Sequence, residues 1–432
     1  MVHRIIEWSL HNRWIVLLLA TGLFVWGIFA VKKNPIDAIP DLSENQVIVY
    51  TEWMGRSPQL IEDQVTYPLV TNLQGLPKIK YVRGSSMFGM SFIYVIFEDD
   101  VDVYWARERV LERLSTINNT LPEGATPQLG PDGTGVGHVL WYTLDAPNTD
   151  LGEQRAIQDW YVKFALQNVP GVSEIASFGG FQKQYQIAVD PNKLLYYKLS
   201  IPEVIAAVRS NNNESGGRKF EMSDIGYIIK TSGYLKSIEE ISAIPVKNQN
   251  GTAIKVSDVA AVQMTGETRL GIFDQDGEGE RVGGIVVMRY GENAAQVIDR
   301  VKNKMKEVAK GLPQGVKFDI VYDRGELIQE SVDSITTTLI EEMIVVSLVV
   351  IVFLFHWRSA VSIIIQIPIT IATSFILLNA FDISSNIMSL TGIALAIGVI
   401  VDNGIVMSEN AYKHLSEKYE RWQAEQQNIN KL

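Results

Sequence analysis

The sequence predicts an α+β membrane protein in which transmembrane helices carry one large domain outside the membrane. Two observations predict this class. Four apolar segments are each long enough to cross a bilayer, since about 20 residues at 1.5 Å rise span its hydrocarbon core. Between the first and second of them, residues 32–334 have ordinary soluble composition, in which strand-like alternation and helical periodicity follow one another.

The apolar segments justify the helices in chain order. The first, Trp14–Val31, has no small-residue cleavage site, so we expect a retained membrane anchor. The others are Ile335–Phe355, Ala360–Ala380 and Ile387–Met407, and Pro368 predicts a kink in the third segment. The helical regions are 1–33, 326–356, 360–380 and 386–410, followed by a polar tail, 411–432, that we expect to be weakly structured.

Basic residues in the short flanks predict the orientation of these helices. The residues that set it are Arg4, Arg13, Arg358, Lys413, Lys418 and Arg421. The link between the third and fourth segments, Phe381–Asn386, has no Lys or Arg. The N-terminus, the second link and the tail are therefore predicted inside, and the large domain outside. Lys32 and Lys33 oppose this pattern, but a long translocated domain weakens their influence.

The outer domain begins with a unit expected at residues 34–135. Its predicted elements are a strand at Gln46–Trp53, a helix at Pro58–Leu73, strands at Tyr81–Ser86 and Ser91–Phe97, and an amphipathic helix at Asp102–Ile117. This β-α-β-β-α order predicts a ferredoxin-like unit.

A second unit of the same kind is expected at residues 136–181 and 271–325. Its predicted elements are a strand near Val139–Leu144, a helix at Arg155–Asn168, a strand at Val282–Tyr290, a helix at Asn293–Lys310 and a strand at Val316–Tyr322. The stretch between, residues 182–270, has strands and small helices of its own and is interpreted as an inserted subdomain.

Composition and motifs exclude several functions. The formal net charge of −11 argues against a nucleic-acid partner. Without cysteine there is no disulfide and no thiolate metal site. The sequence has no Ser-His-Asp set, HExxH or Walker motif, and its GTGVG string opens no Rossmann helix, so we expect neither an enzyme nor a nucleotide or other cofactor. The acidic run FDQDGEGE lacks calcium-loop spacing and predicts a solvated hairpin turn.

One carboxylate stands out in the fourth apolar segment. Asp402 is the sole charged residue between Ile387 and Met407. A carboxylate at that depth costs about 2.5–3.5 kcal/mol on insertion scales, so it is expected to face a bundle interior and to bind and release protons. A buried carboxyl group that is merely hydrogen-bonded is the alternative. Glu341 and Glu342 are interpreted as a solvated helix start, or as a cation-steering pair.

Longer strings carry a family resemblance. They are NPIDAIPDLSENQVIVYTEW, QLIEDQVTYPLVTNLQGLP, VRGSSMFGMSFIYVIFEDDVDVYWARERVLERL, GVSEIASFGGFQKQYQIAVDPNKL and NIMSLTGIALAIGVIVDNGIVMSEN. Together they run along almost the whole chain, which resembles the N-terminal half of the resistance-nodulation-division (RND) efflux pumps. Within that family it resembles the copper/silver type of the heavy-metal branch.

The resemblance implies a fold and partners. The two ferredoxin-like units would be porter subdomains, and the insertion would be the docking subdomain that meets a periplasmic adaptor. Such pumps are trimers in the inner membrane of Gram-negative bacteria, with a large periplasmic domain. They act with an adaptor and an outer-membrane channel, and proton influx drives them. Because the family chain has twelve spans and this one has four, the resemblance implies a fragment, a truncated gene or one piece of a split pump.

The resemblance also implies roles for single residues. Asp402 matches the intramembrane proton carrier. Glu409, two helical turns further along the same face, is a candidate proton entrance or an interfacial carboxylate. Divalent-metal members carry a second Asp where this chain has Ala396, which favours copper(I) or silver(I) as the cargo. Soft monovalent ions prefer sulfur ligands, which here means methionine.

The methionines give incomplete support for this cargo. Met388 matches a relay methionine of the copper/silver type, whereas Ile400 and Thr268 replace two others. Met87 and Met90, with Met54 in the same unit, are further candidate ligands, and the alternative for each is a flexible core filler.

Two other functions stay open at this point. One is an RND pump for divalent metals or organic compounds. The other is a truncated membrane protein that does not transport and serves as a partner in assembly.

Overall fold

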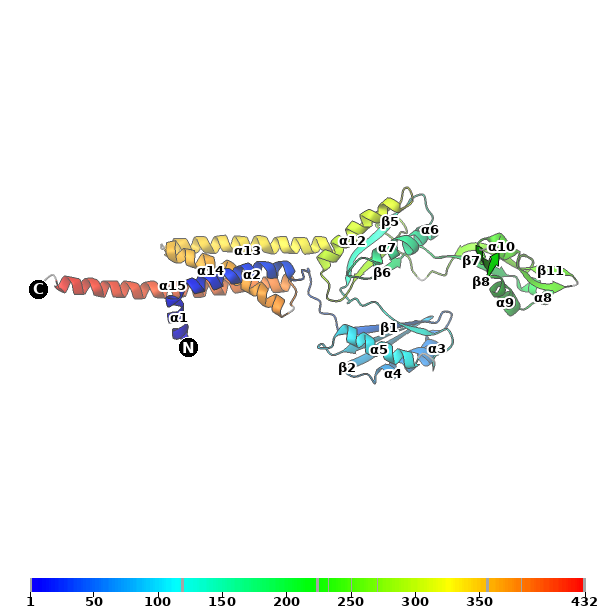
Figure 1. Ribbon diagram of the computed structural model, residues 1–432, viewed down its shortest axis with the longest axis horizontal. Coiled ribbons are helices and arrows are strands. Elements are labelled where there is room, and N and C mark those ends of the chain that lie inside the picture. The colour runs from blue at the N-terminus through cyan, green and yellow to red at the C-terminus, as the bar shows by residue number, and fades with distance from the viewer. Residues whose placement is uncertain are drawn as a thin grey trace.

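The computed structural model describes residues 2–117, 120–222, 225–231, 233–249, 251–269, 271–354, 357–381 and 383–429. The molecule is elongated, with long helices at one end and the outer domain at the other (Figure 1). Two ferredoxin-like units lie next to the helices, and the inserted segment forms the far end.

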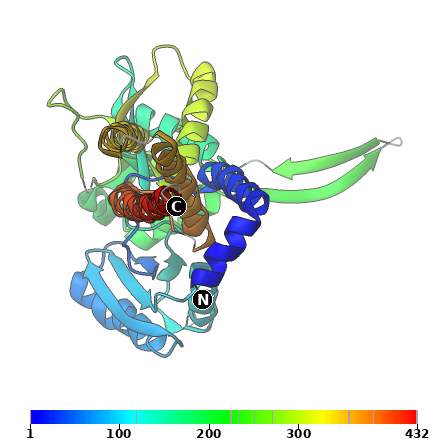
Figure 2. The same cartoon turned by 90° about the vertical axis from the view of Figure 1, so that its left-hand side faces the viewer.

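The helical part consists of α1 (Val2–His11), α2 (Arg13–Lys33), α13 (Arg324–Leu354), α14 (Trp357–Ala380) and α15 (Ile387–Ile429). Within the described residues, Arg13–Lys33 and Ile387–Gln423 are long and apolar enough to cross a membrane, and Ile364–Ala380 is a shorter apolar helix. Seen end-on, these helices lie side by side (Figure 2).

The helices differ from the predicted ones at two ends. Helix α13 begins at Arg324, well before Ile335, so its first turns are polar. Helix α15 continues to Ile429, so the prediction of a weakly structured tail was wrong. Residues 411–429 contain neither Gly nor Pro and are rich in Ala, Glu, Gln and Lys, which are good helix formers and can extend the apolar helix.

The first unit confirms the predicted β-α-β-β-α order. Its elements are β1 (Gln46–Glu52), α3 (Pro58–Ile61), a π-helical turn (Glu62–Thr66), α4 (Tyr67–Leu73), β2 (Ile79–Met87), β3 (Met90–Phe97), α5 (Val103–Ile117) and β4 (Thr126–Leu129). The antiparallel sheet has the order β2-β3-β1-β4. One sheet face packs on the helices through Val47, Val49, Ile93 and Val95, while the alternate residues are turned to the other face.

The second unit repeats this arrangement. Its elements are β5 (His138–Asp145), α6 (Leu151–Ile157), a π-helical turn (Gln158–Val162), α7 (Lys163–Gln167), β6 (Val172–Phe178), β13 (Val282–Met288), α12 (Ala294–Val308), a 3₁₀ turn (Ala309–Gly311) and β14 (Lys317–Asp323). The sheet order β14-β5-β13-β6 is that of the first unit, and β6 is the strand that the sequence analysis did not identify.

The segment between β6 and β13 folds by itself, as expected for an insertion. It contains β7 (Lys183–Val189), α8 (Pro191–Tyr197), α9 (Ile201–Asn211), β8 (Ser215–Met222), β9 (Ile225–Thr231), α10 (Ile238–Ser242), β10 (Pro245–Gln249), β11 (Thr252–Lys255), α11 (Val256–Val259) and β12 (Ala260–Gly266). Its strands form two-stranded sheets, β12-β7, β10-β11 and β8-β9. The β8-β9 hairpin projects sideways (Figure 2).

Candidate functional site

Asp402 lies on the open side of α15. Ile393 and Ile397 of the same helix are buried in a cluster that also contains residues of α13 and α14. At 3.6 residues per turn, Asp402 is on the opposite side of the helix from them, and its side chain is exposed. The carboxylate therefore faces away from both neighbouring helices.

The other predicted residues of this helix share that side. Glu409 is exposed two turns beyond Asp402, and Met388 is 68% exposed near the start of the helix. Leu395, 74% exposed, lies between them on the same face. The face is thus an apolar strip with one carboxylate near its middle and another toward its end, uncovered by the described helices.

The glutamates of α13 are not at a helix start. Because α13 begins at Arg324, Glu341 and Glu342 lie several turns inside it, where the charge of the helix end no longer acts. The interpretation as a dipole-stabilised helix start was therefore wrong. Glu341 is exposed and Glu342 is half-buried.

The acidic run at residues 273–280 forms the predicted turn. Asp274 and Glu280 form an isolated antiparallel bridge. Glu280 is ion-paired with Arg269 and accepts a 3.0 Å hydrogen bond from the Gly180 amide. These contacts give the run a structural role.

A junction that the sequence analysis missed joins the helices to the outer domain. The chain leaving α2 at residues 34–38 lies against residues 383–387, which lead into α15. The Asp37 amide donates to the Ser385 carbonyl at 3.0 Å, and the Ser385 amide donates to the Pro35 carbonyl at 2.9 Å. Asn34 Nδ2 reaches Ser385 Oγ at 2.7 Å. This pairing puts both segments at the same end of the bundle, as the charge pattern predicted.

A buried ion pair completes the junction. Arg324 Nη2, at the first residue of α13, lies 2.8 Å from Asp37 Oδ1, and the side chains are 3% and 18% exposed. Arg324 Nη1 donates to the carbonyl of Val136, just before β5. Burial raises the pKa of Asp37, and the Arg324 charge opposes that rise. One guanidinium thus ties the α2 exit to the second unit.

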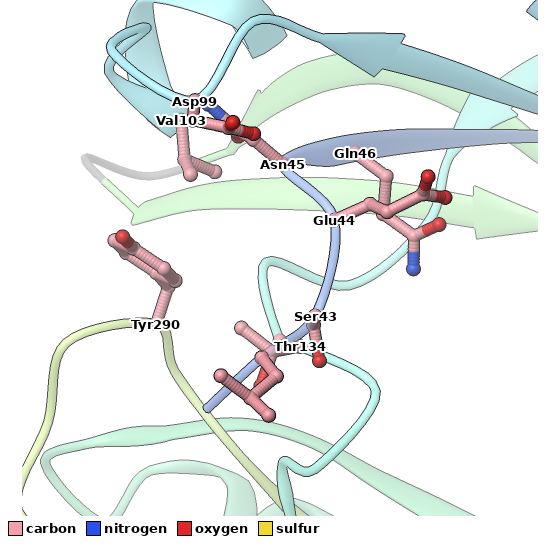
Figure 3. A pocket seen from close by; sticks show the side chains of 10 residues that line it. Ser43, Glu44, Asn45, Gln46, Asp99, Val103, Thr134 and Tyr290 are labelled. Atoms are coloured by element: carbon pink, nitrogen blue, oxygen red, sulfur yellow. The ribbon is translucent and has the colours of Figure 1, made fainter. Parts of the chain in front are cut away.

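Two cavities lie between the ferredoxin-like units. The smaller, about 340 Å³, is lined by the linker before β1, the start of α5 and residues of the second unit such as Tyr290 (Figure 3). Its carboxylates are already paired, Asp99 with Lys80 at 2.6 Å and Glu44 with Arg83 at 3.3 Å. We therefore assign it no ligand.

The larger cavity, about 790 Å³, brings Met90 and Met54 together with Glu52. Met87 does not line it, although it is the register partner of Met90 across the β2-β3 hairpin. Over the described residues, no group of three or more His, Cys, Asp or Glu side chains is placed to hold a metal ion. The sulfur donors are therefore the relevant ones.

Comparison with known proteins identifies the family. The AcrB/AcrD/AcrF family matches residues 5–431. The chain is 45% identical to the cation efflux system protein SilA of Salmonella typhimurium, over 99% of this chain and 41% of that protein. It is 44% identical to the cation efflux system protein CusA of Escherichia coli, over 96% of this chain and 40% of that protein.

A solved structure agrees with the sequence relatives. The crystal structure of a heavy-metal efflux pump superimposes with a TM-score of 0.86 at 31% identity, covering 95% of this chain and 41% of that one. The chain thus spans about two fifths of the length of the proteins it matches. The resemblance drawn from the sequence strings is confirmed: the chain belongs to the AcrB/AcrD/AcrF family, with heavy-metal and cation efflux proteins among its relatives.

Proposed function

We propose that this chain is the N-terminal part of a proton-driven exporter of heavy-metal cations, a secondary transporter and not an enzyme. The observation that carries the proposal is the position of Asp402 on the uncovered face of an apolar helix. A carboxylate there is costly unless other helices cover it and give it a cationic or hydrogen-bonding partner. Further spans of the complete pump would pack on this face and close the proton site, with Glu409 as its entrance.

The proposed location is the bacterial inner membrane, with four spans in this chain and a large periplasmic domain. The two ferredoxin-like units would act as porter subdomains, and the insertion at 182–270 as the docking subdomain. The insertion lies farthest from the helices, which suits contact with a periplasmic adaptor and an outer-membrane channel (Figure 1). The complete pump would be a homotrimer. It would need no resident cofactor, because the metal is its cargo.

Copper(I) or silver(I) is the proposed cargo. Ala396 replaces the second intramembrane carboxylate expected for divalent cargo, and Met388 lies on the same face of α15 as Asp402. A strain that lacks its own pumps, carrying the full-length protein, should gain resistance to silver and copper. Resistance to zinc and cobalt without silver or copper would contradict this cargo.

We also propose that the junction couples the proton site to the outer domain. The amide of Ile387, the first residue of α15, donates to the Ala38 carbonyl at 3.3 Å, next to Asp37. Asp37 in turn contacts Arg324, which directly follows β14. A change in the position of α15 would therefore reach the second unit through packed, hydrogen-bonded contacts.

Asp402→Asn in the full-length pump tests the mechanism. The amide keeps the size of the side chain and cannot cycle a proton, so metal efflux driven by a pH gradient in proteoliposomes should be lost. Asn403→Ala, at the neighbouring exposed position, is the matched control and should retain efflux. Normal efflux by Asp402→Asn would remove Asp402 from the proton pathway.

A further inference from the structure

Three methionines of the first unit are divided by their exposure from the methionines that fill the core. Met288 and Met305 are 9% and 4% exposed and pack in the core of the second unit. Met54 and Met87, by contrast, are 54% and 48% exposed, and Met90 is half-buried at the edge of the large cavity. The role of core filler therefore does not explain these three side chains.

The strand register places two of these methionines next to a carboxylate. Met87 is opposite Met90 across the β2-β3 hairpin, and Glu52 is opposite Met90 across the β3-β1 pair. Residues directly opposite one another share a sheet face, with Cβ atoms about 4.5–5.5 Å apart. The row Met87–Met90–Glu52 therefore lies on one face, the one turned away from the helices of the unit.

The backbone holds Met54 against this row. The Trp53 amide donates to the Gly89 carbonyl at 2.8 Å, and the Gly89 amide donates to the Arg56 carbonyl at 2.9 Å. Gly89 has φ +71°, and a Cβ added there would lie 3.0 Å from the Met54 sulfur. The thioether thus rests directly on the hairpin turn, with its position set by two hydrogen bonds.

Charge in the cavity favours a cation. Glu52 makes no hydrogen bond or ion pair with any described residue, and its carboxylate lines the cavity. The two arginines of the opposite wall are already neutralised, Arg155 by Asp159 at 2.7 Å and Arg269 by Glu280. The unpaired negative charge is thus on the side of the methionines.

We propose that Met54 and Met90, with Glu52 as the counter-charge, form a binding site for a soft monovalent cation, copper(I) or silver(I), in the cavity between the two units. Thioethers are ligands that such ions prefer, and one carboxylate balances a single positive charge. Met87, next to Met90 in the row and outside the cavity, is the neighbouring donor on the rim. The cargo class rests on the proposed function, whereas the site itself rests on the geometry.

Silver binding by the purified 432-residue chain in detergent tests the site. Ag⁺ is titrated in chloride-free buffer and followed by calorimetry and native mass spectrometry. We expect the double variant Met54→Leu/Met90→Leu to lose one bound Ag⁺ or to bind it at least about tenfold more weakly, and Glu52→Gln to weaken binding by a smaller factor. Unchanged binding by the double variant would overturn the site.

Met264→Leu is the matched control, because Met264 is 46% exposed on β12 and does not line the cavity. It should bind Ag⁺ as the parent chain does, and an equal loss in this control would also overturn the site. Thermal melting without metal shows whether each variant is folded. An equimolar addition of Zn²⁺ should leave bound Ag⁺ in place, and displacement by Zn²⁺ would contradict a soft site.

This outcome is separable from that of the proposed function. Asp402→Asn should bind Ag⁺ at the cavity like the parent chain, because the two positions lie at opposite parts of the molecule (Figure 1). Loss of efflux with intact Ag⁺ binding concerns the proton pathway alone. Intact efflux together with unchanged Ag⁺ binding in Met54→Leu/Met90→Leu rejects the cavity site alone.

Discussion

Replacing Arg324 by methionine should open the junction between the helices and the outer domain. Methionine fills much of the space of the arginine stem but removes its charge and its donors. The variant leaves Asp37, 18% exposed, without its cation, and leaves the Val136 carbonyl without its donor. Breaking a buried ion pair on one side costs about 3–5 kcal/mol. Because Asp37 keeps some contact with water, we expect the lower end, about 3 kcal/mol.

Hydrogen exchange followed by mass spectrometry measures this loss locally. The reporting amides are those of Asp37, Ser385 and Ile387, which form the hydrogen bonds between the two segments. A loss of about 3 kcal/mol corresponds to roughly 100-fold faster opening, since 1.4 kcal/mol is a factor of ten. Protection factors within about threefold of the parent chain would refute the assignment of the ion pair as the stabilising contact.

The pH dependence of this variant has a defined sign. Burial raises the pKa of Asp37, and Arg324 opposes the rise. A carboxyl group whose pKa is higher in the folded state destabilises that state as pH rises from its ordinary value through the raised one. Without Arg324 the pKa of Asp37 rises further, so the variant should regain protection near pH 4 and lose it toward neutral pH. An equal loss at both pH values would contradict this reasoning.

Two further variants isolate the cause. Asp37→Asn in the Arg324→Met background removes the uncompensated charge, and it should recover part of the protection at neutral pH. Arg83→Met is the surface control, since Arg83 and Glu44 form an ion pair with side chains 56% and 46% exposed. Its effect should stay within about 1 kcal/mol.

Two packing predictions follow from other contacts. Gly27→Ala should weaken the packing of α2 on α14 by about 1–3 kcal/mol, because the new Cβ would lie 2.4 Å from the Ala372 Cβ; thermal melting in detergent measures it, and Gly22→Ala, with nothing within 4 Å, is the neutral control. Tyr142→Phe should destabilise the second unit by about 1–3 kcal/mol, because the fully buried Gln158 side chain loses its partner at 3.0–3.2 Å; a urea midpoint equal to that of the parent chain would contradict this.

Sequence patterns predicted the elements whose stability is local. The helix at Asp102–Ile117 followed from apolar residues on one face, and the structure has α5 at Val103–Ile117 with those residues buried. The helix at Pro58–Leu73 followed from its cap, and Ser57 Oγ accepts from the Leu60 amide at 3.4 Å. The polar tail of α15 was misjudged because low hydrophobicity was given more weight than helix propensity.

Contacts between distant segments could not be predicted in the same way. Asn34 and Ser385 are 351 residues apart in sequence, and no periodicity in either segment indicates the other. Arg324 looked like an ordinary polar residue at a strand end, and its 3% exposure results from the packing of three separate segments. The methionines were likewise ambiguous, because a core filler and a ligand have the same local sequence, and exposure alone separates Met54 from Met305.

The connection between β14 and α13 determines how the two halves of the molecule can move. β14 ends at Asp323 and α13 begins at Arg324, so no linker residue separates the sheet from the helix. Asp323 Oδ1 accepts from the Gly325 amide at 2.8 Å, and the same side chain is ion-paired with Lys302 of α12. A rotation or shift of α13 must therefore move β14 and α12 with it. The α2 exit is a six-residue-scale loop by contrast, and it follows α13 through Arg324, so breaking that contact should uncouple one connection and leave the other intact.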